Sequence, residues 1–417
     1  MKISEIKPEV YVLAERAIKK LYPVFDKIDA VAMQNTKKVM EAFQENKVSE
    51  SCFAGTTGYG YDDLGREVLD KIYAKIFGTE AALVRINFVN GTHALTAAMF
   101  ATVKPGDVIL SVTGTPYDTL RSAIGISGNC HGSLKFYGID YAEVALAGNG
   151  EPDYEKIEKS ASDKRVAAVM IQRSRGYEDR KALSISEIGK ICDIVHKVNP
   201  TANIMVDNCY GEFTDIVEPT QVGADIMAGS LIKNPGGGIA PTGGYIAGKA
   251  ELVERAAMRL TTPGIGGECG STLGNNRLLF QGMFVAPHTV AQALKTAAFC
   301  AAMMDELGIE SSPSFDAERS DIIQMVKLGS PEKMKKFCLG IQSGAPVDSF
   351  VTPEPWPMPG YDCPVIMAAG SFIQGSSIEL SADGPIREPY TVYVQGGLTF
   401  ESGKLGIMMA VSAMLDK

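Results

Sequence analysis

Asp207 and Lys233 are the residues of this chain whose types and surroundings point most directly to chemistry. Asp207 closes a short apolar run at 204–206, and Lys233 follows a second run at 224–229. Such runs are typical of buried parallel strands, whose carboxyl ends form the ligand-binding edge of an α/β sheet. An amine and a carboxylate at that edge suit pyridoxal phosphate. The amine forms a Schiff base with the aldehyde, and the carboxylate keeps the pyridine nitrogen protonated.

A phosphate site is predicted where small residues open a helix after a strand, at Gly91, Thr92 and His93. Free backbone N–H groups and the helix dipole attract an anion there. An ordinary strand-to-helix turn has the same pattern, and His93 also fits stacking on the cofactor ring or simply starting the helix. Ser230, three residues before Lys233, is a candidate to hold a phosphate oxygen.

Further polar and aromatic residues follow other predicted strands. Tyr117 comes after the strand predicted at 108–112, where a ring can stack on a planar cofactor. Tyr210 and Asn208 follow Asp207 and are candidates to contact the cofactor, Tyr210 by a hydrogen bond to the oxygen on the cofactor's ring. Gln172 ends another strand, where a polar group meets the cofactor or the substrate. A buried core position is the alternative for both tyrosines.

An amino-acid substrate needs a carboxylate clamp, and arginine is the natural residue because its fork pairs with a carboxylate bidentately. Arg387, between Pro385 and Pro389, is the first candidate. Arg319 and Arg277 are alternatives, and a plain surface arginine also fits the pattern at Arg387.

Two other chemistries have weaker support. Ser230-x-x-Lys233 matches a serine acyl-enzyme pattern, but the companion Ser-Asp-Asn and Lys-Thr-Gly motifs are absent. The eight cysteines form no CxxC or CxH pair, so neither a zinc site nor a disulfide framework is indicated, and no metal is expected. Reduced thiols in the cytoplasm are the simpler interpretation.

The elements that must position these residues alternate as in an α/β fold. We predict helix over residues 1–50, interrupted at Pro23, and a glycine-rich loop at 51–65 with Tyr59 and Tyr61 as its prominent side chains. That loop either lies on the surface or reaches an active site, its own or a neighbour's. Strands are predicted at 81–85, 108–112, 134–137, 166–171, 243–247, 321–326, 365–369 and 377–380.

Composition sets outer limits. The chain has 417 residues, is 45% hydrophobic and carries a net charge of −9 without a basic block, which argues against nucleic acid. No run of about 18 apolar residues predicts a membrane span. We expect an N-terminal helical arm (1–50), a large cofactor-binding domain (51–285) and a small α+β domain (286–417). The arm is expected to pack on the small domain or on a partner subunit.

Four stretches resemble a known family: TTGYGYDDLGRE (56–67), NGTHAL (90–95), VDNCYGEF (206–213) and SLIKNPGGGIAPTGGYIAG (230–248). The chain resembles fold-type I pyridoxal-phosphate enzymes of cysteine and methionine metabolism, in the branch of aluminium resistance proteins and methionine gamma-lyase-like carbon–sulfur lyases. The resemblance covers nearly the whole chain. It implies a large α/β domain with a mostly parallel seven-stranded sheet flanked by helices, plus a smaller α+β C-terminal domain.

The resemblance also implies residue roles. Lys233 is the Schiff-base lysine, Asp207 the pyridinium partner, and Tyr117 stacks on the ring. Gly91, Thr92 and Ser230 cradle the phosphate. Tyr59 is supplied across a homodimer or homotetramer interface to the neighbour's phosphate. An arginine stands two residues after that tyrosine in better-known gamma-lyases, but this chain has Tyr61, so the clamp between subunits differs here.

The expected activity is elimination from a sulfur amino acid after Lys233 removes the α-proton, with Tyr117 as acid to the leaving sulfur. The sequence leaves open β- or γ-elimination. An aminotransferase or an aldolase on the same scaffold is the main alternative. A non-catalytic, cofactor-binding stress protein is an alternative of a different class.

Overall fold

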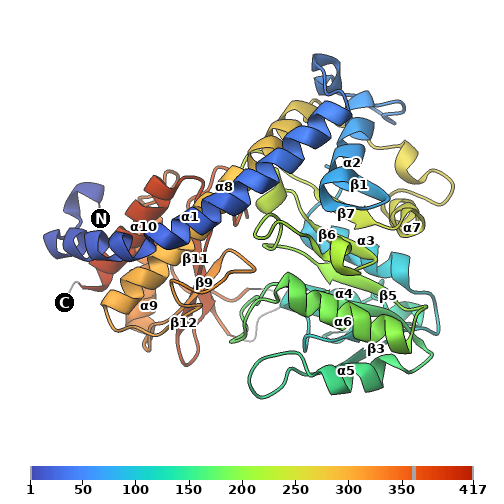
Figure 1. Ribbon diagram of the computed structural model, residues 1–417. Helices are drawn as coiled ribbons and strands as arrows, with labels where there is room; N and C mark the ends of the chain where they lie inside the picture. Colours follow the sequence, from blue (N-terminus) through green and yellow to red (C-terminus); the bar gives the residue numbers. More distant parts are fainter. Residues whose placement is uncertain (1, 129, 359–362, 416–417) are drawn as a thin grey trace.

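The computed structural model describes residues 2–128, 130–358 and 363–415, so the outermost residues of the predicted arm and small domain lie outside it. Two sheets organise the chain. The larger has the strand order β1-β7-β6-β5-β4-β2-β3, and the smaller has the order β10-β11-β12-β9-β8. Figure 1 shows the two sheets in separate lobes, joined by the long helices α1 and α8.

The large sheet is mixed. Its strands are β1 (Ala81–Arg85), β2 (Val108–Ser111), β3 (Asp140–Glu143), β4 (Val166–Gln172), β5 (Asn203–Asp207), β6 (Ile226–Ser230) and β7 (Gly244–Gly248). β7 runs antiparallel to both neighbours, and the pairs from β6 to β3 are parallel. The small sheet is antiparallel and contains β8 (Ser311–Ser312), β9 (Ile323–Lys327), β10 (Val365–Ala369), β11 (Ser381–Pro385) and β12 (Thr391–Gln395).

Helices cover both faces of the large sheet. Successive side chains of a strand point to opposite faces, and here side chains on both faces are buried. In β5, Ile204 and Val206 join the core beneath α2, α5, α6 and α8, whereas Met205 joins the core beneath α3, α4 and α7. The helices are α1 (Pro8–Glu45), α2 (Leu64–Phe77), α3 (Gly91–Thr102), α4 (Asp118–Ile124), α5 (Tyr154–Ala161), α6 (Ile185–Val198), α7 (Ala250–Leu260), α8 (Asn276–Glu306), α9 (Pro331–Ser343) and α10 (Phe400–Met414).

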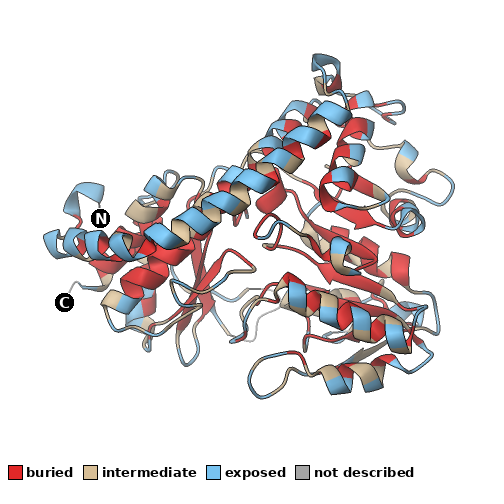
Figure 2. Cartoon of the chain, viewed as in Figure 1, coloured by how far each residue is buried: buried red, intermediate tan, exposed pale blue. Residues whose placement is uncertain are grey.

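The helical arm is one helix, so the predicted break at Pro23 is wrong. Pro23 lies inside α1, on its exposed side. Proline has no N–H to donate to the carbonyl of Lys19, but Lys19 is also exposed, so water can bind that carbonyl. The start of α1 buries Val10 and Leu21 in the small-domain core, and its end buries Val39 in the large-domain core. Its outer face is exposed (Figure 2).

Two predicted strands are also wrong. Residues 134–137 do not form a strand, because Lys135–Tyr137 is a 3₁₀ helix ended by left-handed Gly138, and the strand follows at β3. The strand predicted at 377–380 lies further along, at β11, whose sequence SADGP has no apolar run. Pairing with β10 and β12 makes that segment a strand despite its low intrinsic preference.

The boundary expected between residues 285 and 286 falls within α8, whose start packs in the large-domain core and whose end packs in the small-domain core. Short 3₁₀ helices complete the chain at Ile3–Glu5, Glu50–Phe53, Pro219–Val222, Asn234–Gly236 and Gly266–Glu268. None of the helices in the described residues is long and apolar enough to cross a membrane.

Candidate active site

Three predicted site residues end neighbouring strands of the large sheet. Gln172, Asp207 and Ser230 are the last residues of β4, β5 and β6. Gln172 stands beside Asp207 in the register of the parallel pair, and Asp207 stands beside Ala228 of β6. The sheet therefore brings together polar groups that are far apart in the sequence, at its carboxyl edge.

Lys233 lies just beyond β6, at the start of the tight turn Asn234–Gly236. Its Nζ is 4.0 Å from the centroid of the Tyr210 ring, a cation–π contact. Burial lowers the pKa of the Lys233 amine, but the acidic groups around it, including Asp207, outweigh burial and raise that pKa above its ordinary value. The amine thus has a fixed position beside the loop that follows Asp207.

Asp207 is a buried carboxylate, and its Oδ1 accepts a hydrogen bond from the backbone N–H of Cys209 at 3.1 Å. Burial raises its pKa above the ordinary value, although Lys233 and the Cys209 hydrogen bonds act in the opposite direction. A carboxylate in this setting is stabilised in its ionised form by a further cation. A protonated pyridine nitrogen is such a cation.

Tyr210 joins the two lobes at this edge. Its backbone is left-handed (φ 71°), which turns the chain sharply after Asn208 and Cys209 and places the ring beneath Lys233. The hydroxyl is 3.0 Å from the Ser377 Oγ of the small domain. The ring therefore supports the lysine while its hydroxyl is held from the other lobe.

The predicted phosphate turn is built as a helix N-terminus against β6. Asn90 caps α3, because its Oδ1 accepts the His93 backbone N–H at 2.8 Å. A Cβ added to Gly91 would lie 3.0 Å from the Ser230 Cβ, so the backbone approaches Ser230 too closely for a side chain. The Thr92 hydroxyl is 3.0 Å from that of Thr119. Backbone donors and hydroxyl groups thus gather at one helix end.

The His93 side chain takes part in the local fold of that turn. Its Nδ1 accepts the Val89 backbone N–H at 3.3 Å, and its ring meets Phe88 edge-on. Burial, with a smaller contribution from Arg259, lowers its pKa, so the neutral imidazole is favoured. These contacts match the helix-starting role among the three that the sequence left open.

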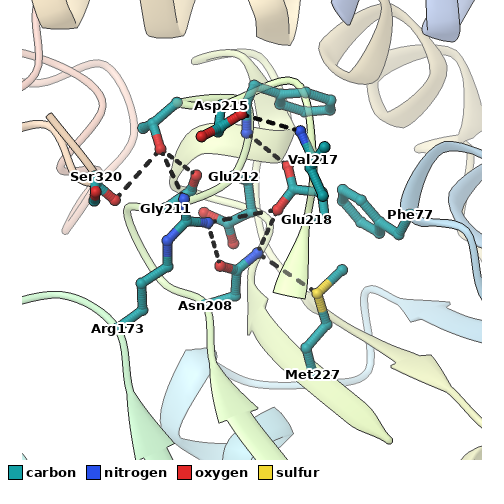
Figure 3. Close-up of polar contacts among 12 residues, drawn as sticks. Phe77, Arg173, Asn208, Gly211, Glu212, Asp215, Val217, Glu218, Met227 and Ser320 are labelled. Atoms are coloured by element: carbon teal, nitrogen blue, oxygen red, sulfur yellow. Dashed lines mark hydrogen bonds and ion pairs between the residues drawn. The ribbon is translucent and has the colours of Figure 1, made fainter. Parts of the chain in front are cut away.

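Asn208 faces away from Asp207, into a buried polar network that Figure 3 shows. Its Oδ1 accepts a hydrogen bond from Arg173 Nη1 at 2.8 Å, and its Nδ2 donates to Glu218 Oε2 at 3.0 Å. Both ends of the amide are occupied, so the structure does not bring Asn208 to the cofactor position that we predicted. Its role is to hold the loop after β5.

A cavity of about 220 Å³ lies between the two lobes and brings together Tyr117, Gln172 and Arg387. The Gln172 amide connects two strand ends, because its Oε1 accepts the Tyr117 backbone N–H at 2.8 Å and its Nε2 donates to the Ser174 carbonyl at 3.1 Å. Gln172 thus positions Tyr117. Arg387 is exposed, in the turn between β11 and β12.

Tyr59 stands apart from these residues. It is 73% exposed, and its ring stacks on that of Tyr61 with the centroids 5.7 Å apart. Within one chain it therefore contributes a surface side chain.

The sequence did not single out several residues of this region, although Arg175 and Tyr177 belong to the polar stretch that follows the strand at 166–171. Arg175 and Tyr177 line the cavity, Cys209 donates to Asp207, and the buried Glu212 accepts a hydrogen bond from the Tyr245 hydroxyl at 2.8 Å. Arg175 and Tyr177 follow a strand end, the same signal that selected Gln172. The burial of Glu212 had no signal in the sequence, because it depends on the way in which the loop closes over β6.

The fold is the one that defines a class of proteins, the fold-type I pyridoxal-phosphate-dependent enzymes. The pyridoxal-5'-phosphate dependent protein YhfS from Escherichia coli shares the fold with a TM-score of 0.60 at 16% identity, over 90% of this chain and 94% of that one. A mixed seven-stranded sheet with a smaller antiparallel domain is therefore confirmed as the predicted fold class.

The family is more specific. The model of the methionine gamma-lyase family matches residues 10–415, so the chain belongs to that family. A carbon-sulfur lyase involved in aluminum resistance from Clostridium novyi NT is 53% identical with a TM-score of 0.94, over 98% of this chain and 96% of that one. The uncharacterized protein YnbB of Bacillus subtilis (strain 168) is 48% identical over 94% of each chain.

Proposed function

We propose that this protein is a pyridoxal-phosphate-dependent carbon–sulfur lyase acting on a sulfur amino acid such as methionine, cystathionine or cysteine. One observation carries the proposal. Lys233 and Asp207 share the carboxyl edge of the large sheet with the helix end at Gly91, which lies against Ser230. Family membership and the similar carbon-sulfur lyase support the choice of reaction.

The described residues fit this cofactor. A Cβ on Gly91 would lie in tight contact with Ser230, at 3.0 Å from its Cβ, and its absence suits close approach of backbone N–H groups to a phosphate. Burial raises the pKa of Asp207 even though Lys233 is nearby. A pyridinium nitrogen would supply the further cation that stabilises the ionised carboxylate. When bound, pyridoxal phosphate withdraws electrons from the α-carbon of an amino acid.

The roles of the side chains follow from their places. Lys233 would hold the cofactor through its amine, and its Nζ would accept the α-proton of the substrate. Tyr210 beneath it limits the directions in which the amine moves. Tyr117, positioned by Gln172 at the cavity wall, donates a proton to the leaving sulfur. Arg387 borders the same cavity, on the side of the small domain.

The proposal includes assembly of the chain with itself, as a homodimer or homotetramer with shared sites. Tyr59 is exposed on the glycine-rich loop and stacked on Tyr61, which makes both rings available to a second copy. Tyr61 replaces the expected arginine, so the shared contact to a phosphate relies on the tyrosine hydroxyl.

Replacing Lys233 tests the proposal. Lys233→Ala is expected to abolish the visible absorbance of lysine-linked cofactor and to reduce release of keto acid, ammonia and thiol by at least about 10³-fold. Lys190→Ala is the matched control, because Lys190 also lies over a tyrosine ring, at 3.6 Å from the Tyr154 centroid, but on an exposed helix surface. An unchanged spectrum in Lys233→Ala contradicts the cofactor assignment, and amine transfer to a second keto acid contradicts the lyase assignment.

A further inference from the structure

Three arginines are grouped next to the cavity, where the loop after β4 meets the small domain. Arg175 is 1% exposed and Arg180 is 6% exposed. Arg319 has two nitrogens, Nε and Nη1, that are buried without a hydrogen-bond partner among the described residues. Buried cations are stable in proteins when anions or multiple hydrogen bonds compensate them. The balance of charge around these three side chains therefore matters.

Asp321 is the main acid acting on Arg180 and Arg319. Its carboxylate is occupied by other donors. Oδ2 accepts from the Ser174 hydroxyl at 2.9 Å and from the Arg175 backbone N–H at 3.3 Å, and Oδ1 accepts from the Ile323 backbone N–H at 3.0 Å. Burial lowers the pKa of Arg180 and of Arg319 to about 10, and Asp321 is the first acid that opposes this on both, with Glu178 and Asp207 contributing less to Arg180.

Arg175 is the member of this group that lines the cavity. Its Nη1 donates to the Ser312 carbonyl at 3.1 Å, which fixes the guanidinium from the small domain. Its Nε is buried without an acceptor, and Nη2 has no hydrogen bond to the described residues. A fixed, poorly compensated cation at a cavity wall attracts an anion strongly, because the low local dielectric weakens screening.

The other two arginines of the cavity are less suited to this task. Arg121 forms an ion pair with Asp118 at 2.8 Å and lies 3.9 Å from Glu178, so its charge is already compensated. Arg387 is exposed and solvated by water. An anion that binds to it must order this long side chain, which lowers the binding affinity. Arg175 is already ordered.

We propose that Arg175 anchors a carboxylate in this cavity, and that Arg387 closes over the opening of the same cavity without being the anchor. The inference rests on the proposed function, because it treats the cavity as the substrate pocket and the anion as the substrate's carboxylate. The cavity volume of about 220 Å³ suits a small carboxylate rather than a bulky anion. Gln172 connects the cavity wall to Asp207 through the sheet register.

Binding of a small carboxylate to the purified protein tests Arg175 without turnover. The probes are propionate and its uncharged analogue propionamide, compared by thermal unfolding at matched ionic strength. Propionate is expected to raise the unfolding temperature saturably, and propionamide is not. Arg175→Gln should weaken propionate binding by about tenfold or more, since it removes a charge-assisted hydrogen bond to the carboxylate. Arg387→Gln should weaken it by less than about threefold.

Two further variants keep the result interpretable. Arg165→Gln, a surface arginine paired with Asp163 at 3.1 Å, is the matched control and should bind propionate as the unchanged protein does. Arg175→Lys retains the charge but loses the fork, so it should fold, keep cofactor absorbance, and raise KM for an amino acid more than it lowers kcat.

Several outcomes overturn the proposal: no saturable propionate effect in the unchanged protein, equal binding by Arg175→Gln, or loss in Arg387→Gln alone. Failure of the Arg175 proposal can be distinguished from failure of the proposed function. If Lys233→Ala leaves the spectrum unchanged while Arg175→Gln still abolishes propionate binding, the anion site stands and the cofactor assignment fails. The reverse pattern leaves the cofactor and removes the anchor.

Discussion

Asp207 and Asn208 are consecutive residues with opposite destinations, and the two regions that they enter differ in how their charges are matched. In the network of Arg173, Asn208 and Glu218 the two charges are paired within the protein, although the Arg173 Nε has no hydrogen-bond partner among the described residues. Asn208 uses both ends of its amide, and Glu218 accepts from Phe213 and Asn208 while lying 3.6 Å from Arg173. The strand-end region around Asp207 and Lys233 differs in that Asp207 forms no ion pair with the described residues, although burial raises the pKa of Asp207 and of Glu218 alike.

The difference teaches how to separate support from chemistry among polar residues that follow the same strand. A polar group whose donors and acceptors are all matched inside the protein holds the loop. A buried charge that lacks a full complement marks a place for a ligand. Arg175, like Asp207 and Lys233, is a buried charge without a full set of partners, and we therefore assign it to ligand binding. Asn208 has a partner at both ends of its amide, and we therefore assign it to support of the loop.

Removing the charge of Asp207 should lower catalysis far more than any change in the Arg173, Asn208 and Glu218 network. Asp207→Asn is expected to lower kcat/KM by about 10²-fold or more, because the amide no longer stabilises a cation at the buried site. Stability should change little, since the amide oxygen still accepts the Cys209 N–H. Steady-state kinetics and thermal unfolding measure the two effects. Unchanged kinetics would place Asp207 with the structural network.

Breaking the network of Arg173, Asn208 and Glu218 should lower stability strongly and change catalysis per folded molecule little. Glu218→Ala leaves the buried Arg173 unpaired, so the free energy of unfolding should fall by about 3–5 kcal/mol. Denaturant unfolding measures this loss. Glu158→Ala is the control, because its pair with Lys197 lies on the surface and contributes less than about 1 kcal/mol. Loss of cofactor absorbance per folded molecule in Glu218→Ala would contradict the separation of the two regions.

Glu212 links the regions and predicts a pH dependence. Burial raises its pKa to about 8, from 4.5 in an unstructured chain. The unfolded chain releases this proton at lower pH than the folded chain, so the contribution to stability is complete below about pH 4.5. It is lost as the pH rises to about 8, by up to about 1.4 kcal/mol per pH unit.

Glu212→Gln should remove this contribution, because glutamine does not titrate and still accepts the Tyr245 hydroxyl hydrogen bond. Unfolding free energies measured from pH 5 to pH 8 should fall less steeply in the variant than in the unchanged protein. Parallel pH profiles for the two proteins would show that Glu212 is already ionised in the folded state.

The smallest expected effect is at the helix end. Gly91→Ala places a Cβ 3.0 Å from the Ser230 Cβ, so the turn must shift by a few tenths of an ångström. Affinity for pyridoxal phosphate should fall by about tenfold, roughly 1.4 kcal/mol. Gly148→Ala is the control, because a Cβ there meets nothing within 4 Å. Equal cofactor affinity in titrations of both variants would remove Gly91 from the phosphate site.

Much of the frame could be predicted because its signals are local. The apolar run at 204–206, the left-handed Gly78 that ends α2, and the capping box of Ser184 with Glu187 are all consequences of neighbouring residues. The errors arose where tertiary contacts outweigh local preference. β11 is a strand because two neighbours pair with it, and α1 continues through Pro23 because its length packs on both cores.

The sequence by itself determined the acid and the amine at two strand ends and the small-residue helix start at Gly91, because each depends on neighbouring residues, and the resemblance over nearly the whole chain gave the fold class. Only the tertiary structure decided which way Asn208 points, which groups the His93 ring contacts and which arginines share a cavity. Arg175 and Arg387 meet there because two lobes, built from distant segments, close on one space. Burial and charge balance arise from that closure, and no local pattern records them.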